Sequence, residues 1–424
     1  MQFHTLALLG LVAVTSAWLP GVNKAITALD GQSLFQSNGT NTTVPVAGRR
    51  SFKRWLPSLT PIRGVNLGSL FIVEPWMAMT EWESMGCTGY NSEFDCVNGI
   101  GQDAANTAFQ NHWNTWITEN DIATMVSYGL NTIRIPVGYW MREDIVYADS
   151  EHFPQGGLQY LEQVCGWASD HGLYIIIDLH GAPGAQVVNN SDTGQFASEV
   201  GFYVDYQFER ALQFLEWMTT LVHTTTAFRN VGMLEIVNEP LRDPTQVGTM
   251  LSTYYPNAFT RIRAAESALG NITANNELHI QMMNTKWGSG TPEQYLTDDY
   301  FAAYDDHRYV KYDSSVPLTH DGYIQSSCND DRGGDSPTIV GEWSLSPSPE
   351  NDTDWLANSD NAAFYTQWFE AQVHAYEKQL GWIFWSWKTS LNDYRWAYSG
   401  MFFLAPSSRE TVYPRGLEKP KTKY

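Results

Sequence analysis

Basic residues are scarce in this 424-residue chain, which has 25 Lys and Arg against 46 Asp and Glu and a net charge of −21. Domains that bind nucleic acid carry basic surfaces, and anionic membrane surfaces attract cations. Beyond the N-terminal segment, no apolar run reaches the ~18 residues that a membrane-spanning helix requires. We therefore expect neither nucleic acid nor a membrane among the partners of this protein.

Cysteines are also few, at four. The sequence has no Cys-x-x-Cys and no His-Glu-x-x-His motif, so we expect no metal site and no cofactor. Cys87 and Cys96 bracket a segment rich in Gly, Asn and Ser, and we expect them to pair across a surface loop. Cys165 and Cys328 would then remain, either free or as a second bridge, since four cysteines allow three pairings.

Residues 1–17 are typical of a signal peptide. Leu6 to Val14 form an apolar core, and Thr15-Ser-Ala17 offers small residues for cleavage. Sequons for N-glycosylation agree with a secreted, extracellular protein, and they lie at Asn38, Asn41, Asn189, Asn271 and Asn351.

Residues 18–61 form a polar, irregular N-terminal extension. It contains two dibasic pairs, Arg49-Arg50 and Lys53-Arg54. A secretory-pathway protease acting after Arg54 would make this segment a propeptide and leave Trp55 as the mature N-terminus. The alternative is a solvated basic loop.

From Ile62 onward, apolar strand-like segments alternate with helical patterns. Most strands are continuous apolar runs, as parallel strands buried on both faces require. We predict strands at Ile62–Leu67, Thr132–Pro136, Tyr174–Leu179, Met233–Val237, His279–Met283, Arg308–Lys311, Thr338–Gly341 and Trp382–Trp385. The helical patterns lie at Thr118–Leu130, Leu158–Ser169, Phe208–Val222, Tyr254–Ala268 and Ala362–Lys378.

This alternation predicts an α/β fold, a single-domain (β/α)8 TIM barrel over residues 62–398. Long segments after the first, third and seventh strands fit a substrate cleft at the C-terminal face of the barrel. Residues 399–424 are an atypical C-terminal tail, because no amphipathic helix follows the eighth strand to cover it.

Two glutamates follow apolar strands about a hundred residues apart. Glu239 lies in Asn238-Glu-Pro240, and Glu342 follows the run Thr338–Gly341. Glycoside hydrolysis needs two such carboxyl groups, one as proton donor and one as nucleophile or base. The alternative is that both glutamates are buried ion-pair partners of barrel arginines.

Other polar or aromatic residues are placed at the ends of further strands. Each has a plain structural alternative, such as a hydrogen-bonded core histidine or a packed tryptophan, but together they converge on one face of the barrel. They are Arg134, His180, His307, Tyr309 and Trp385. The 17 tryptophans of the chain also favour a carbohydrate enzyme, because indole faces stack on sugar rings.

These motifs resemble glycoside hydrolase family 5, from about Ile62 to Tyr398. Gly64-Val-Asn-Leu-Gly68, Arg134-Ile-Pro-Val-Gly-Tyr-Trp140 and His180-Gly-Ala-Pro-Gly184 are similar to its fungal β-glucanase branch. Ser92-Glu-Phe-Asp-Cys96 and Gly129–Tyr147 look most like the endo-β-1,6-glucanases of that branch. The longer segment at residues 40–60 and the tail after Tyr398 depart from it.

The resemblance implies a retaining reaction with Glu239 as acid/base, Glu342 as nucleophile and their carboxyl groups ~5–5.5 Å apart. We expect a raised pKa for Glu239 because a second carboxylate is near. Arg134 and Tyr309 would keep Glu342 ionised. Substrate contacts are expected from Asn238 at the sugar 2-OH, Trp385 by stacking, and His180, His307 and Glu74 at hydroxyls or carboxylates.

The expected function is therefore hydrolysis of β-1,6-glucan by a secreted monomer. Two alternatives remain open at this stage. One is an exo-β-1,3-glucanase, and the other is a glucan-binding wall protein without catalysis.

Overall fold

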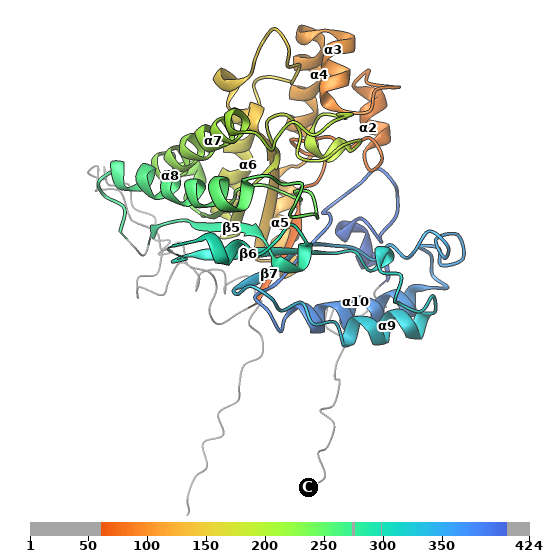
Figure 1. The fold of residues 1–424 in the computed structure, drawn as a ribbon. Helices are drawn as coiled ribbons and strands as arrows, with labels where there is room; N and C mark the ends of the chain where they lie inside the picture. Colours follow the sequence, from red (N-terminus) through yellow and green to blue (C-terminus); the bar gives the residue numbers. More distant parts are fainter. Residues whose placement is uncertain (1–60, 274–275, 298, 405–424) are drawn as a thin grey trace, which may run out of the picture.

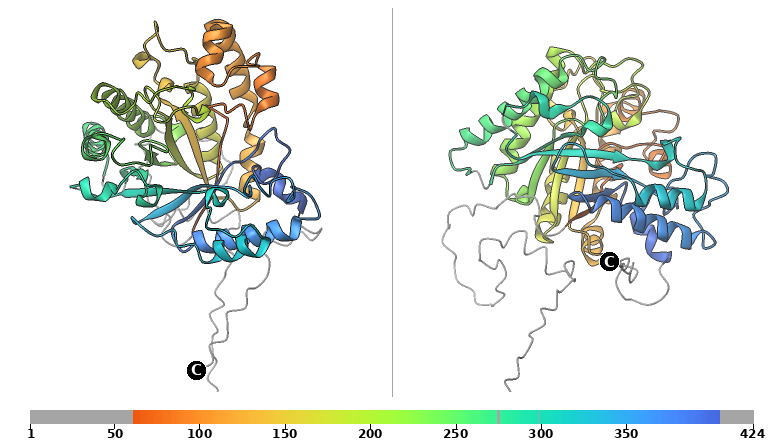
Figure 2. Two further views of the ribbon diagram at one scale, coloured as in Figure 1. Left: turned by 45° about the vertical axis from the view of Figure 1, so that its right-hand side comes forward. Right: turned by 60° about the horizontal axis from the view of Figure 1, so that its bottom comes forward.

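The structure, a computed structural model, describes residues 61–404 apart from 274–275 and 298. Eight parallel strands close into a barrel, each paired with the next and β8 with β1, which confirms the predicted fold class. Figures 1 and 2 show the strands surrounded by helices. The strands are β1 (Ile62–Asn66), β2 (Thr132–Gly138), β3 (Tyr174–Gly181), β4 (Val231–Glu235), β5 (His279–Met283), β6 (Ala302–Arg308), β7 (Thr338–Trp343) and β8 (Gly381–Phe384). The expected signal peptide and N-terminal extension lie outside the described residues.

Six helices surround the barrel, and five of them fall where the periodicity predicts. α5 begins with a capping box in which Thr118 and Asp121 exchange side-chain and backbone hydrogen bonds. In Figure 1, α7 lies along α8, and α9 lies along α10. The six are α5 (Glu119–Ser127), α6 (Leu158–Asp170), α7 (Asp205–Thr224), α8 (Tyr255–Ala268), α9 (His320–Cys328) and α10 (Ala362–Tyr376). The sequence analysis missed α9, whose nine residues carry few apolar positions.

The sixth strand is not where the sequence analysis predicts it. The prediction places it at Arg308–Lys311, whereas β6 spans Ala302–Arg308 and residues 310–312 form a short 3-10 turn. The strand contains Asp305-Asp306-His307, all buried. Three polar residues in succession interrupt the apolar pattern by which a buried strand is predicted. Their charged partners, Arg134, Arg332 and Glu239, lie elsewhere in the chain, so the sequence does not show that these residues are buried.

Alternation along the strands divides the barrel interior into two layers. At the N-terminal end the inward side chains are apolar, and the layer consists of Ile62, Tyr174, Ile176, Met233, Ala303, Ile339 and Ile383. On three of these strands the inward side chain two residues further along is acidic, namely Asp178 after Ile176, Glu235 after Met233 and Asp305 after Ala303. The lower layer supports the barrel, and the upper layer forms the base of the candidate site.

A helical insertion follows β1 and extends away from the barrel (Figure 1). It contains α2 (Met79–Ser84), α3 (Glu93–Ile100) and α4 (Gln102–Thr115). Cys87 and Cys96 form the expected disulfide, and the short segment between them lies at the surface, with Thr88, Gly89 and Asn91 exposed. Both cysteines are fully buried, and Cys96 lies within α3. Cys165 and Cys328 are free, so no second bridge forms.

No α-helix follows β8 within residues 385–404, and the rest of the expected C-terminal tail, residues 405–424, lies outside the described residues. A 3-10 segment, Tyr398–Leu404, ends the described part of the chain. Tyr398 packs against Trp382 and Phe384 with ring centroids 6.1 and 5.7 Å apart, so an aromatic side chain covers part of β8. Within the residues described, no helix combines the length and apolarity needed to cross a membrane.

The disulfide should stabilise the insertion because it restricts the conformations that the unfolded chain can adopt. Its cysteines are separated by nine residues, for which loop-closure entropy predicts a stabilisation of about 2–3 kcal/mol. We expect the double variant Cys87→Ser/Cys96→Ser to lose about that much in urea unfolding. Cys328→Ser, which removes a free thiol, is the control. Equal midpoints for the two variants would contradict the prediction.

Candidate active site

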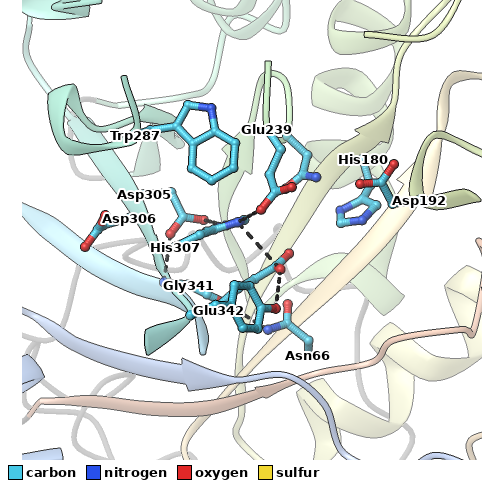
Figure 3. A network of polar contacts seen from close by, with 12 residues as sticks. Asn66, His180, Asp192, Glu239, Trp287, Asp305, Asp306, His307, Gly341 and Glu342 are labelled. Atoms are coloured by element: carbon cyan, nitrogen blue, oxygen red, sulfur yellow. Dashed lines mark hydrogen bonds and ion pairs between the residues drawn. The ribbon is translucent and has the colours of Figure 1, made fainter. Parts of the chain in front are cut away.

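Glu239 and Glu342 lie together at the C-terminal mouth of the barrel (Figure 3). One carboxylate oxygen of Glu239 is within 4.8 Å of one of Glu342. Glu342 is inside β7, whereas Glu239 lies four residues beyond β4. Glu239 has a φ of 38°, a left-handed backbone conformation that non-glycine residues rarely adopt and that often marks functional sites.

Both carboxylate oxygens of Glu342 are held by hydrogen bonds. Arg134 Nη1 donates to Oε1 at 2.9 Å, and the Tyr309 hydroxyl donates to Oε2 at 2.8 Å. The side chain is 6% exposed. Two fixed donors and little freedom give this carboxylate a defined orientation into the site.

Glu239 is held on one side only. His307 Nδ1 lies 2.7 Å from Glu239 Oε1, and its Nε2 lies 3.4 Å from Asp305 Oδ2. Both ring nitrogens therefore face carboxylates, an arrangement in which only an imidazolium can donate to both. The Glu239 side chain is 20% exposed, so it is the more open of the two glutamates.

His307 also lies 3.5 Å from Glu342 Oε2, so the three groups titrate together. Burial lowers the pKa of His307, but the charges of Glu342 and Asp305 raise it well above its ordinary value. Burial raises the pKa of Glu239, but the hydrogen bond and charge of His307 outweigh this and lower it. The expected raised pKa of Glu239 is therefore wrong, because the hydrogen bond and the charge of His307 favour the ionised form of this carboxyl group.

Glu342 has the raised pKa of the pair. Burial is the main cause, and the positive charges of His307 and Arg134 oppose it only in part. The expectation that Arg134 and Tyr309 favour the ionised form agrees in direction with their hydrogen bonds. In the unliganded site, burial and the negative charge of Glu239 outweigh them.

Arg134 is the centre of a buried ionic cluster below the two glutamates. Its guanidinium contacts four carboxylates, at Asp178 (3.0 Å), Glu235 (2.8 Å), Asp305 (3.6 Å) and Glu342 (2.9 Å). It also donates to the side-chain oxygens of Asn66 and Asn238 at 3.0 and 2.8 Å. Sequence analysis missed Asp178, Glu235 and Asp305, although each is an acidic residue inside an apolar strand or beside one.

His180 and Trp385 form one wall of the site. Their rings are parallel, with centroids 5.6 Å apart and an interplanar angle of 9°. His180 Nδ1 lies 2.6 Å from Asp178 Oδ2, and the charge of Asp178 raises the pKa of His180 against the opposing effect of burial. Trp385 is 4% exposed, so only part of its ring faces the open site.

Glu74 reaches the same region from the segment after β1. Trp76 Nε1 donates to its Oε2 at 2.8 Å, while its buried Oε1 has no hydrogen-bond partner. Burial raises the pKa of Glu74 to about 7, and the charge of His180 opposes the rise. Asp192 is a second buried carboxyl with a raised pKa, caused by burial and by the charge of Glu239; the sequence analysis did not identify it.

Aromatic residues that the sequence analysis did not select also border the site. Trp396 contacts Trp76 and Tyr309 at centroid distances of 5.0 and 6.0 Å. The ring of Trp287 lies next to that of His307, with centroids 5.7 Å apart (Figure 3). Their positions depend on loop conformation, so sequence alone carried no signal for them.

Within the described residues, two sets of side chains have the spacing of a metal site. One is Glu239, His307 and Glu342, and the other is Glu235, Asp305 and His307. His307 hydrogen-bonds to Glu239 in the first set and to Asp305 in the second, and it lies 3.5 Å from Glu342, while Glu235 accepts a hydrogen bond from Arg134. These side chains therefore have a sufficient explanation as a proton-sharing network.

Residues 97–390 match the cellulase family, glycosyl hydrolase family 5. The chain is 62% identical to glucan endo-1,6-beta-glucosidase B of Emericella nidulans, over 91% of this chain and 92% of that one. It is 27% identical to glucan 1,3-beta-glucosidase 2 of Wickerhamomyces anomalus, over 87% and 93%. A rutinosidase from Aspergillus niger shares the fold, with a TM-score of 0.62, 19% identity and 83% and 97% of the two chains covered. The chain thus belongs to glycoside hydrolase family 5.

Proposed function

We propose that this glycoside hydrolase cuts internal β-1,6 linkages of β-glucan with retention of anomeric configuration. The observation that carries the retaining mechanism is the proximity of the two carboxylates, since one oxygen of Glu239 lies within 4.8 Å of one oxygen of Glu342. Retaining enzymes place their carboxyl groups ~5–5.5 Å apart, whereas inverting enzymes leave ~6.5–9.5 Å for a water molecule.

Glu342 is the nucleophile in this proposal. Arg134 and Tyr309 fix its two oxygens, so it can attack the anomeric carbon from a defined direction. Attack gives a covalent glycosyl-enzyme, and the glycosidic C–O bond breaks. Water then attacks the same carbon and releases Glu342.

Glu239 is the acid/base because it is the more exposed of the pair and its partner His307 carries a proton. The proton moves from the Glu239–His307 pair to the leaving oxygen in the first step. In the second step Glu239 accepts a proton from the attacking water. A strongly raised pKa of Glu239 is then unnecessary, since the imidazolium supplies the proton through the 2.7 Å hydrogen bond.

Asn238, Trp385, His180 and Glu74 complete the sugar site. Asn238 Nδ2 is buried and has no hydrogen-bond partner, so it is free to donate to the sugar 2-OH. The free Oε1 of Glu74 is an acceptor for another hydroxyl. Trp385, fixed against His180, offers an aromatic surface to the ring.

The β-1,6 linkage is favoured by similarity. Identity is 62% to a relative named for endo-1,6 activity and 27% to one named for 1,3 activity. The signal-peptide pattern and the sequons support an extracellular enzyme. We propose that it acts as a monomer, because each chain supplies both carboxyl groups of its own site.

The two glutamates should respond differently to substitution. Glu342→Gln is expected to reduce kcat by at least ~10⁴-fold on every substrate, because it cannot form the covalent intermediate. Glu239→Gln should lose a similar factor on glucan, but far less in the first step on an aryl glucoside whose leaving group needs no proton. Rates on the two substrates test this, with exposed Glu119→Gln on α5 as the control. Equal losses on both substrates in Glu239→Gln would refute its role as the acid.

Tyr309→Phe should move the acidic limb of the pH–rate profile. Glu342 must be ionised to attack, so activity falls as pH drops through its pKa. The lost 2.8 Å hydrogen bond stabilises the ionised form, so its removal raises the pKa by about one unit and shifts the limb to higher pH. Tyr160→Phe on α6 is the matched control. A limb that stays in place would contradict the assigned contact.

Products from pustulan (β-1,6) and laminarin (β-1,3) separate the linkage alternatives. We expect fast early release of mixed oligosaccharides from pustulan and slow reaction with laminarin. Glucose as the sole early product, mainly from laminarin, would make the enzyme an exo-β-1,3-glucanase. Binding to pustulan without hydrolysis of any glucan would indicate a glucan-binding protein.

A further inference from the structure

The buried cluster under the active site contains more carboxyl groups than cations. Its acidic members are Asp178, Glu235, Glu239, Asp305 and Glu342, and its basic members are Arg134, His180 and His307. Even with both histidines charged, and with the charge of Arg242 also acting on Glu239, five carboxylates face four cations. Uncompensated charge in a dry interior is very costly, so at least one of these carboxyl groups should hold a proton.

Glu235 is the carboxyl with the weakest support for a negative charge. Its Oε2 accepts both contacts from Arg134, at 2.9 Å from Nε and 2.8 Å from Nη2. Its Oε1 is buried and has no hydrogen-bond partner. Asp178 also has one buried oxygen, Oδ1, without a partner, but its Oδ2 lies within 3.0 Å of the cations of both Arg134 and His180.

Asp305 and Glu342 are also better supported than Glu235. Asp305 accepts a backbone N–H from Gly341 at 2.8 Å and faces His307. Glu342 accepts from Arg134 and Tyr309. Glu235 hydrogen-bonds to no cation except Arg134, which it shares with three other carboxyl groups, although the charge of nearby His307 also acts on it.

The groups around Glu235 come from five elements. Arg134 is on β2, Asp178 on β3, Asp305 and His307 on β6, and Tyr255 begins α8.

From β5, Gln281 is the register partner of Glu235, and all its side-chain polar atoms lack partners. The Tyr255 hydroxyl also lacks one. Neither side chain therefore donates a hydrogen bond to Glu235 Oε1. A neutral hydroxyl at Oε1 costs much less to bury there than a bare carboxylate oxygen.

We propose that Glu235 is a neutral, protonated acid in the folded enzyme and a positioning residue for the nucleophile. It holds Arg134 in place through Oε2 without neutralising it, so that the guanidinium charge remains available to Glu342. The second half of this statement rests on the proposed role of Glu342. In support, burial raises the pKa of Glu235 well above its ordinary value, against the opposing charge of Arg134.

Infrared spectroscopy in D₂O tests the protonation state without using activity. The difference between wild type and Glu235→Gln at neutral pH should show loss of a protonated-acid carbonyl band. Asp178→Asn, which alters another partner of Arg134, should instead show loss of a carboxylate band. Loss of a carboxylate band in Glu235→Gln would overturn the proposal, as would a stoichiometric metal ion found in the purified protein by mass spectrometry.

Kinetics test the positioning role. If Glu235 is neutral, Glu235→Gln keeps the charge of the site, and the acidic limb of the pH–rate profile stays within about 0.3 units of wild type. If it were ionised, loss of a nearby negative charge would lower the limb by about one unit. Glu235→Leu removes the support for Arg134 and should lower kcat about 10- to 100-fold with little change in KM. A protonated-acid band together with an unchanged kcat in Glu235→Leu would leave the neutral acid standing and refute the positioning role.

Discussion

The ion pair between Arg134 and Glu342 is the interaction on which the site depends. A guanidinium cannot lose its proton in a protein, so its burial at the centre of the barrel requires carboxylates around it. These carboxyl groups come from β3, β4, β6 and β7. The same guanidinium orients the side chains of Asn66 and Asn238 through hydrogen bonds. The ionic layer therefore acts as a frame that fixes the direction of each functional side chain, rather than as a source of net stability.

Space for this frame comes from small residues at the neighbouring strand positions. Gly341 precedes Glu342 on β7, and a Cβ at Gly341 would lie 2.1 Å from Asp305 Oδ1. The same glycine donates its N–H to that oxygen at 2.8 Å. Asp305 in turn faces His307, which contacts both glutamates. Gly341, which has no side chain, thus helps to determine where His307 lies.

The sequence predicted much of this and failed for identifiable reasons. Continuous apolar strands followed by single polar residues identified the barrel, Glu239, Glu342 and Arg134, because each lies in a segment whose pattern is otherwise unbroken. β6 was misplaced because Asp305, Asp306 and His307 follow one another in it, so polar residues fall on both of its faces and interrupt the apolar pattern. Glu235 was missed because its buried charge is compensated by Arg134 on another strand. Such pairing across a barrel has no signature in a single sequence.

The insertion after β1 fixes the segment that carries Glu74, a residue proposed to contact a sugar hydroxyl. Glu93 in α3 accepts the backbone N–H of Val73 at 2.8 Å, and His112 in α4 hydrogen-bonds the carbonyl of Ser69 at 2.6 Å. The Ser69 hydroxyl in turn accepts the backbone N–H of Glu74 at 3.1 Å. The segment that carries Glu74 is therefore held from outside the barrel by the helices of the insertion. Burial raises the pKa of Glu74 to about 7, so in the proposed sugar site this fixed carboxyl group would donate a hydrogen bond when protonated and accept one when ionised.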